Sequence, residues 1–252
     1  TEKIISHTNT ARRKARNQGD SICAYTPELA YAELLRADVL HSFQSALEKE
    51  EFILYFQPKI AGQNAEITSA EVLVRWRRAD GEIWGPNKFI SVLEECGKVE
   101  ALDFYVYEKA FQWMVGQRKC RTQPVTLSLN ISPFHFRDIE GFTKKLLDII
   151  NKYKIDTRYL IFEITESAYI RNRDAVNKMI SILHEYHIRI SMDDFGSGYS
   201  SLNTLKDIAF DEVKIDKSFL DGSLTEKGRI VLQEIFHLLK RTGKSIVCEG
   251  VE

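Results

Sequence analysis

Two adjacent carboxylates, Asp193 and Asp194, stand out as residues whose types and spacing could do chemistry. They end a run in which Ile188, Ile190 and Met192 alternate at the period of two that is typical of a strand. Glycines follow at positions 196 and 198, and glycine lets a backbone approach a ligand closely. Because adjacent acids repel each other and are costly to bury without a cation, the segment predicts a metal or phosphate site at the carboxyl end of a strand. The alternative is an acidic turn that caps a helix.

Polar residues also interrupt the other strand-like runs, although parallel strands covered on both faces should be almost entirely apolar. A single buried acid is more often a satisfied structural group. Burying this many polar and acidic groups together is prohibitive unless cations bind among them. Oxygen donors favour Mg²⁺ or Mn²⁺ over zinc, and the histidines do not cluster at these positions. Besides the Asp pair, the interrupting residues are Gln57, Glu71, Asn130, Glu163, Lys214, Asp216 and Glu249.

Strands that alternate with helices are needed to position these residues. The first connection, residues 59–66, is too short for a helix, so the first two strands are expected to be antiparallel. The later runs alternate with patterns of helical period, which predicts a parallel sheet. The expected fold is α/β, a modified (β/α)8 barrel with an antiparallel first strand and its last strand missing from the chain. The predicted strands are residues 52–58, 67–76, 125–131, 159–165, 189–194, 212–216 and 245–250, and the predicted helices between them are residues 89–96, 102–115, 141–153, 174–187, 202–208 and 227–241.

Composition excludes some classes of partner. Lys and Arg number 35 against 36 Asp and Glu, and the net charge of −1 gives no global field that would attract a nucleic acid polymer or a membrane. No apolar run reaches about 18 residues, so we expect a soluble, cytoplasmic segment without membrane contact. The four cysteines form no CxxC pair, which suits a reducing compartment. The chain lacks an initial Met and ends directly after a strand-like run. We therefore expect a piece of a longer protein, which could be membrane-anchored through an upstream region.

The amino-terminal part has its own pattern. Residues 1–20 are expected to form a polar helix with a solvated basic face, followed by a short extended piece and a second helix from Pro27.

Short motifs at the strand ends follow one another in a fixed order. They are Gln57-Pro58, Glu71-Val72-Leu73 with Arg75-Trp76, Phe89-Ile90, Leu129-Asn130-Ile131-Ser132, Glu163-Ile164-Thr165-Glu166, Asp193-Asp194-Phe195-Gly196-Ser197-Gly198-Tyr199-Ser200-Ser201-Leu202, Lys214-Ile215-Asp216 and Glu249-Gly250-Val251-Glu252. Together they resemble the EAL domain of bacterial cyclic di-GMP phosphodiesterases, from about residue 40 to the end. Residues 10–16 resemble, with low specificity, the tail of a diguanylate cyclase (GGDEF) domain. We therefore expect residues 1–37 to be such a tail with a linker helix, and residues 38–252 to be an EAL domain with an incomplete carboxyl-terminal end.

The resemblance implies a modified TIM barrel that hydrolyses one phosphodiester of cyclic di-GMP to linear pGpG. It also implies two Mg²⁺ or Mn²⁺ ions per site, which can clamp the scissile phosphate and activate water at neutral pH. By resemblance, the first ion is expected to be held by Glu71, Asn130, Glu163 and Asp193, and the second by Asp193, Asp194 and Glu249.

Catalytic roles carried over from the family fall on Glu249, Lys214, Asp194 and Glu71. Glu249 is the candidate base, or a metal ligand that helps to activate water. Lys214 would lie near the attacking water and the phosphate, oriented by Asp216.

Substrate and loop roles are also implied. Arg75 offers a guanidinium fork to the other phosphate. Gln57 and Leu73 would line the substrate cleft, and Glu252 would support Lys214 or the guanine site. Glu166 would brace the loop of residues 195–201, which begins with Phe195, Gly196 and Ser197. In the family this loop couples metal binding to dimerisation, so a homodimer is expected.

Two residues depart from the family pattern. Val72 stands in place of the signature Ala, which should change packing more than chemistry, and Ser197 replaces a frequent Thr. Degenerate family members usually lose an acid such as Glu71, Asp193 or Asp194, and this chain keeps all three.

Three alternatives to an active phosphodiesterase stay open. The first is a catalytically weak or inactive receptor that only binds cyclic di-GMP. The second is another acid-rich barrel, such as an enolase-type enzyme, which leaves the glycine-rich loop unexplained. The third is a scaffold that uses its surface helices, which leaves the buried acids unexplained.

Overall fold

The computed structural model describes residues 24–61, 66–118, 124–197, 209–221 and 225–250, together with Thr8 and Arg12. The chain divides into two compact units. One comprises Thr1–Ile53 and Val74–Val99, and the other comprises Leu54–Leu73 and Glu100–Glu252. Every residue that forms the candidate site below belongs to the second unit.

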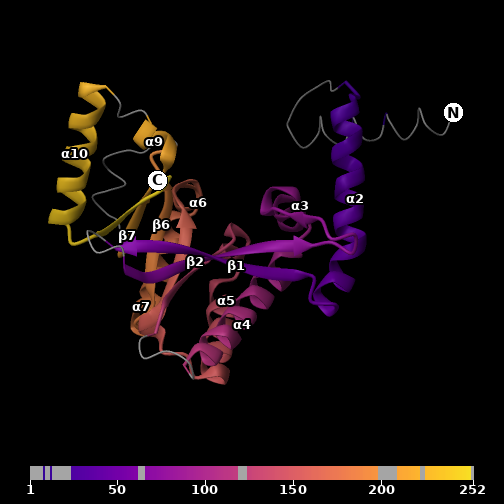
Figure 1. Ribbon diagram of the computed structural model, residues 1–252, viewed down its shortest axis with the longest axis horizontal. Coiled ribbons are helices and arrows are strands. Elements are labelled where there is room, and N and C mark those ends of the chain that lie inside the picture. The colour runs from indigo at the N-terminus through magenta and orange to yellow at the C-terminus, as the bar shows by residue number, and fades with distance from the viewer. Residues whose placement is uncertain are drawn as a thin grey trace. The chain divides into compact units, whose positions relative to one another are not determined.

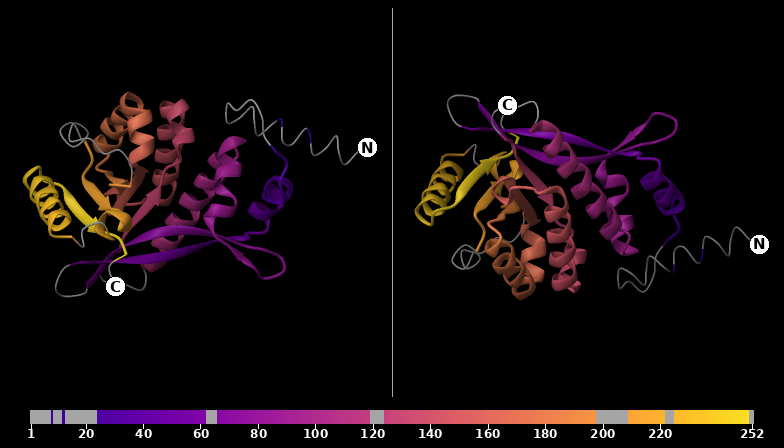
Figure 2. Two further views of the ribbon diagram at one scale, coloured as in Figure 1. Left: turned by 90° about the horizontal axis from the view of Figure 1, so that it is seen from above. Right: turned by 90° about the horizontal axis from the view of Figure 1, so that it is seen from below.

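Most of the sheet belongs to the second unit, where its strands curl into half of a barrel (Figures 1 and 2). The order among the described strands is β1-β2-β4-β5-β6-β7-β8, and neighbours from β2 onward are parallel. A hydrogen bond from the Arg77 N–H to the Glu51 carbonyl joins the end of β2 to the start of β1, which makes this pair antiparallel as predicted. The strands are β1 (Phe52–Ala61), β2 (Glu66–Arg77), β4 (Thr126–Asn130), β5 (Leu160–Thr165), β6 (Arg189–Phe195), β7 (Glu212–Ile215) and β8 (Ser245–Cys248).

Helices α5 (Ile139–Tyr153) and α7 (Arg173–Glu185) cover the outer face of this sheet (Figure 2). Their apolar residues recur every three or four positions, so each helix buries one side and leaves the other in water. Asp138 caps α5 by accepting a hydrogen bond of 2.9 Å from the Gly141 N–H. Because the outer face is covered, polar strand residues have to point into the barrel. The buried residues of the two helices are Ile139, Phe142, Thr143, Leu146, Ile150, Val176, Met179, Ile180 and Leu183.

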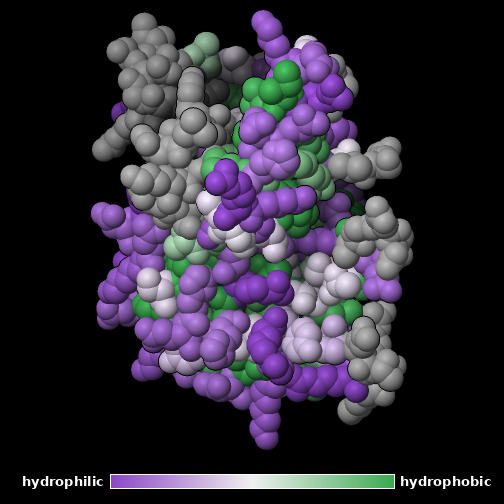
Figure 3. Space-filling model, turned by 90° about the vertical axis from the view of Figure 1, so that its left-hand side faces the viewer, coloured by the Kyte–Doolittle hydropathy of each residue, from purple (hydrophilic) through white to green (hydrophobic). Residues whose placement is uncertain are grey.

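The remaining helices of the second unit differ in how much they bury. Helix α10 (Glu226–Arg241) packs beside β8, and Leu239 is its one fully buried side chain. The face that carries α10 mixes apolar and polar groups (Figure 3). The other helices that include residues of this unit are α4 (Val99–Gln117), α6 (Glu166–Arg171), α9 (Lys217–Asp221) and the short 3₁₀ turns η3 (Pro133–Arg137) and η4 (Thr157–Tyr159).

The first unit contains α2 (Pro27–Glu48), β3 (Ile83–Trp84), η2 (Pro86–Lys88) and α3 (Ile90–Glu95). The Arg78 guanidinium lies 4.6 Å from the ring centre of Trp76 and 4.4 Å from that of Trp84. It also donates to both carboxylate oxygens of Asp38, at 2.8 and 2.9 Å. Cation–π and charge-assisted contacts together therefore tie β2, β3 and α2 into one small core.

All seven predicted strands are confirmed, as are five of the six predicted helices between them and the helix that begins at Pro27. The predicted helix at residues 202–208 and most of residues 1–20 lie outside the described residues. The sequence patterns did not predict β3, α6 or α9, which are six residues long or shorter. No helix in the described part of the chain is long and apolar enough to cross a bilayer.

Candidate functional site

Strand register brings the predicted polar residues to one end of the sheet. Glu71 pairs with Ser128 across β2 and β4, and Asn130 pairs with Glu163 across β4 and β5. Asp193 on β6 pairs with Thr165. Because neighbouring parallel strands end together, their last polar side chains converge there.

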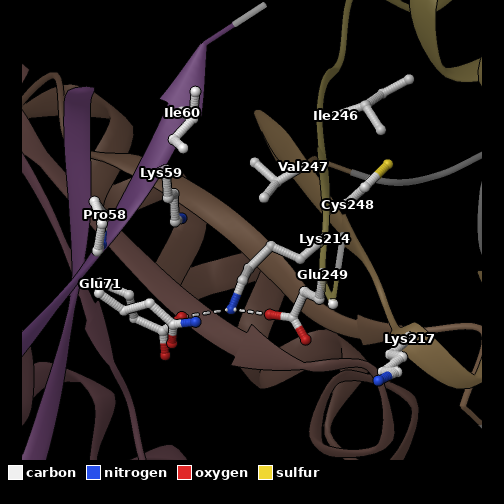
Figure 4. Close-up of a pocket in the computed structure, with 12 residues that line it drawn as sticks. Pro58, Lys59, Ile60, Glu71, Lys214, Lys217, Ile246, Val247, Cys248 and Glu249 are labelled. Carbon is white, nitrogen blue, oxygen red and sulfur yellow. Dashed lines mark hydrogen bonds and ion pairs between the residues drawn. The ribbon is translucent and has the colours of Figure 1, made fainter. Parts of the chain in front are cut away.

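The Lys214 ammonium lies at the centre of this convergence (Figure 4). Its Nζ is 2.8 Å from Glu71 Oε2, 2.9 Å from Glu163 Oε2, 2.8 Å from Asp193 Oδ1 and 2.8 Å from Glu249 Oε1. Only 2% of the lysine side chain is exposed. Burial alone would lower the pKa of Lys214, but the surrounding carboxylates outweigh it and raise that pKa. Four predicted metal ligands therefore meet at one point.

Lys59 provides a second, largely buried ammonium group that sequence analysis missed. It extends from β1 to Ser128 Oγ at 2.8 Å, Glu163 Oε1 at 2.8 Å and Glu212 Oε1 at 3.2 Å. Burial would lower its pKa, but Glu163 and Glu212 outweigh this effect and raise the pKa of Lys59. A usable signal existed, because residues two apart in a strand share a face and Gln57 was already expected to line the cleft.

Asp193, Asp194 and Glu249 form an acidic cluster in which one oxygen from each lies within 4.8 Å of the others. The register between β6 and β7 shifts between Met192 and Phe195, so a bulge occurs where the Asp pair lies. Asp194 has a left-handed backbone with φ of 57°, and its N–H donates to Asp193 Oδ1 at 3.0 Å. The bulge lets two consecutive carboxylates approach the same glutamate. These three side chains could hold a hard cation.

The acids of the site have shifted pKa values for different reasons. Burial, with the charge of Asp193 next in importance, raises the pKa of Asp194 to about 6. Burial, together with the charge of Glu163, also raises the pKa of Glu71 and of Asp193, in spite of the opposing effect of Lys214 on each. For Glu163, burial works in the same direction, but Lys214 and Lys59 together outweigh it and lower the pKa. The carboxylate between the two lysines is therefore the one best held in its charged form.

Asn130 and Glu71 are in contact. The Asn130 Nδ2 donates to Glu71 Oε1 at 3.2 Å, and the amide oxygen is a further oxygen donor at this end of the sheet. The backbone of Asn130 is fixed from behind, because the Tyr107 hydroxyl donates to its carbonyl at 2.8 Å.

Glu166 braces the turn that follows the Asp pair. Its buried Oε2 accepts a hydrogen bond of 3.2 Å from the Gly196 N–H. The Ser197 hydroxyl donates to the Asp194 carbonyl at 2.8 Å, and Phe195 is buried. The structure thus brings together the predicted loop-support residues, while residues 198–201 lie outside the described residues.

A pocket of about 690 Å³ adjoins the carboxylates (Figure 4). Gln57 lines it, together with Glu71, Lys214 and Glu249. Gly250 closes the wall at a φ of 67°, and a Cβ there would lie 2.6 Å from Lys217 Cδ, so the chain can approach this closely only with glycine. Its other lining residues are Pro58, Lys59, Ile60, Lys217, Ile246, Val247 and Cys248.

Three described residues that were predicted to contact substrate do not line this pocket, and a fourth predicted residue is not among the described residues. Leu73 is half-buried on β2, and Arg75 belongs to the first unit, where it donates to the Val74 carbonyl at 2.9 Å. Asp216 accepts hydrogen bonds from the Ser218 N–H, at 2.8 Å, and from the Ser218 hydroxyl. Glu252 lies outside the described residues. The roles of these four stay predictions.

The family of the chain follows from comparison with known proteins. The profile of the EAL domain matches residues 40–252. The chain belongs to the EAL domain family. Among the curated relatives of this EAL domain, the cyclic di-GMP phosphodiesterase PdeL of Escherichia coli (strain K12) is 31% identical over 208 residues, which is 82% of this chain and 57% of PdeL. The signaling protein YkoW of Bacillus subtilis (strain 168) is 31% identical over 230 residues, which is 90% of this chain and 28% of YkoW.

Solved EAL domains share the architecture. The PaMucR phosphodiesterase in complex with c-di-GMP superposes with a TM-score of 0.78 at 28% identity, over 85% of this chain and 87% of that one. The FimX EAL domain from Pseudomonas aeruginosa bound to c-di-GMP gives a TM-score of 0.76 at 24% identity, over 85% of this chain and 86% of that one, which supports the fold alone. The predicted fold and family are therefore confirmed, and the chain spans only part of the length of its curated relatives.

Proposed function

We propose that this EAL domain hydrolyses cyclic di-GMP to linear pGpG with the help of divalent metal ions. The observation that carries the proposal is the convergence of Glu71, Glu163, Asp193 and Glu249 on one buried point. The name of its relative PdeL, a cyclic di-GMP phosphodiesterase, supports the substrate.

The donor set fits a hard divalent cation. Every convergent group offers oxygen, which suits Mg²⁺ or Mn²⁺. Glu71, Asn130, Glu163 and Asp193 would hold one ion, and Asp193, Asp194 and Glu249 would hold the second. Divalent ions bound there would lower the pKa of water and offset the charge of a phosphodiester.

Charge balance supports two ions rather than one. Six carboxylates meet in this cluster: Glu71, Glu163, Asp193, Asp194, Glu212 and Glu249. Lys59 and Lys214 neutralise two of these charges, which leaves four for bound cations. Two divalent ions supply that charge, whereas one would leave a net anionic site facing an anionic substrate.

Residues of the chain itself would carry out the proton and phosphate handling. Glu249 projects from the end of β8 into the pocket wall and would accept a proton from the attacking water. The water oxygen forms a new bond to phosphorus while the bond to the 3′ oxygen breaks, the leaving 3′ oxygen takes a proton from solvent, and Glu249 releases its proton to solvent. Lys214 would stabilise charge on the phosphate oxygens as a buried cation.

Other roles belong to the same proposal. Gln57, Leu73, Arg75, Asp216 and Glu252 would contact the nucleotide, and Glu166 would hold the turn at Gly196 and Ser197. We further propose that the domain works as a homodimer in the cytoplasm, and that residues 1–37 end a preceding GGDEF-like domain and form a linker helix.

Turnover separates this function from that of a receptor. The purified chain is incubated with cyclic di-GMP and Mn²⁺, and products are separated by chromatography, with an EDTA-treated sample as control. We expect pGpG to form only when the metal is present. Tight nucleotide binding without pGpG would instead identify a receptor module. Isothermal titration with Mn²⁺ alone should give two ions per chain, and one ion would contradict the charge argument.

A further inference from the structure

The two oxygens of Glu163 face two different lysines. Oε1 lies 2.8 Å from Lys59, and Oε2 lies 2.9 Å from Lys214. The glutamate side chain is fully buried, so no solvent competes for either oxygen. Each oxygen therefore has a separate ammonium partner.

Only one of these oxygens faces the convergent ligands. The lysine on Oε2 also contacts Glu71 and Asp193, so Oε2 points toward the centre of the site. The lysine on Oε1 contacts Ser128 and Glu212, which belong to no predicted metal ligand set. A cation that replaced the Lys214 ammonium would meet Oε2 and leave the contact at Oε1 in place.

We propose that Lys59 is a positioning residue of the metal site, which holds Glu163 through Oε1 so that Oε2 is presented to the ion. This inference rests on the proposed function, because it assigns Glu163 to a bound metal. Ligands held from behind by a hydrogen-bonding partner lose less entropy when the ion binds, and loss of such a partner typically weakens metal binding by about 10- to 100-fold. Lys59 is well placed for this task because it reaches Glu163 from β1, a strand that β2 and β4 separate from β5 in the sheet order.

The direction in which Mn²⁺ affinity changes when Lys59 is removed shows whether this residue positions Glu163 or acts only through its charge. If Lys59 acted only as a nearby positive charge, its removal would strengthen the attraction of the site for Mn²⁺. If it positions Glu163, its removal weakens Mn²⁺ binding in spite of that attraction. The two roles thus predict changes in opposite directions.

The test compares Mn²⁺ affinity by isothermal titration for the wild-type chain and three variants. Lys59→Met removes the ammonium, Glu212→Met removes the other carboxylate partner, and the double variant removes both and keeps the net charge of the cluster. Because a buried ion pair is replaced there by apolar groups of similar size, the double variant should stay folded even if Lys59→Met does not. Circular dichroism and thermal melting confirm the fold of each.

We expect Lys59→Met and the double variant to bind Mn²⁺ about 10- to 100-fold more weakly, and Glu212→Met to change affinity by less than about 10-fold. Hydrolysis by the folded Lys59 variants should recover when Mn²⁺ is raised to saturation, because the lost step is metal binding. Unchanged or tighter binding in either Lys59 variant would overturn the inference. Absence of Mn²⁺ binding in the wild-type chain would instead refute the proposed function.

Discussion

Lys214 and Glu163 form a buried ion pair, with 2.9 Å between Nζ and Oε2. Both side chains are sealed from water, and the same ammonium reaches three further carboxylates. In the absence of a divalent cation, this lysine is therefore the main source of positive charge for the acids of the site.

Lys214→Met is expected to destabilise the metal-free protein strongly. Breaking a buried pair by removing one partner typically costs about 3–5 kcal/mol, because the remaining charge is left uncompensated. Urea unfolding in EDTA measures the change. Lys217→Met is the matched control, since Lys217 also lines the pocket and no described carboxylate pairs with it, and it should shift stability by less than about 0.5 kcal/mol. Saturating Mn²⁺ should raise the melting temperature of Lys214→Met more than that of the wild type; an equal rise would contradict this account.

Glu71→Ala should abolish turnover of cyclic di-GMP. Glu71 contacts Lys214 and Asn130 and would ligate the ion directly. Loss of a residue that only supports a metal ligand typically lowers activity by up to about 100-fold. Loss of a ligand itself, such as Glu71, should therefore lower activity by more than about 100-fold. The exposed acid Glu226, on α10, provides a control substitution to Ala. Cleavage by Glu71→Ala at the wild-type rate would show that the metal assignment is wrong.

Asp194 should make the metal-free protein less stable as pH rises from about 4 to about 6. The native carboxyl has a pKa of about 6, whereas that of an unfolded chain is about 3.9. Between these values the native state holds a proton that the unfolded state has released, so the free energy of unfolding falls as pH increases. Urea midpoints measured in EDTA from pH 4 to pH 7 report the slope.

Asp194→Asn is the matched variant for that measurement, because Asn tolerates the left-handed backbone at this position. The decline between about pH 4 and about 6 should be shallower in this variant. The variant also removes the repulsion between Asp193 and Asp194, so the difference between the two curves reports the titration of the pair. If the urea midpoints of the two proteins changed in parallel with pH, Asp194 would not contribute to the pH dependence of stability.

Glu166→Ala should loosen the turn after the Asp pair. The Gly196 N–H would lose its acceptor, so its hydrogen exchange should accelerate relative to that of the Ile131 N–H, which is bonded to the Glu163 carbonyl at 2.9 Å. Glu166→Gln keeps a carbonyl oxygen that can accept this hydrogen bond, so the Gly196 N–H should exchange more slowly in Glu166→Gln than in Glu166→Ala. If the Gly196 N–H were equally protected from hydrogen exchange in all three proteins, Glu166 would not brace this turn.

Period-two runs and motif order were enough to predict the strands and the convergence of Glu71, Glu163 and Asp193, because parallel strands carry their last residues to one edge. Lys59 was missed because the strand was expected to stop at Pro58, whereas β1 continues to Ala61. A lysine just beyond a strand is normally a solvated residue, and the signal that this one points inward was its spacing of two residues from Gln57.

Short-range features also escaped prediction. Strand β3 has only two residues and α6 only six, which is too short for a periodic pattern. The division of Glu163 between two lysines depends on side chains 51 and 104 residues away in sequence, and no local pattern encodes such a contact.

The bulge in β6 makes the length of this strand as important as its composition. In a regular strand, consecutive side chains point to opposite faces, so one member of the Asp pair would turn toward the helices. The extra residue lets Asp193 and Asp194 both approach Glu249. A strand that kept both acids but lost the bulge would turn one of them away from Glu249 and dismantle the cluster, so the presence of these acids in a sequence is a poor guide to whether such a domain can act.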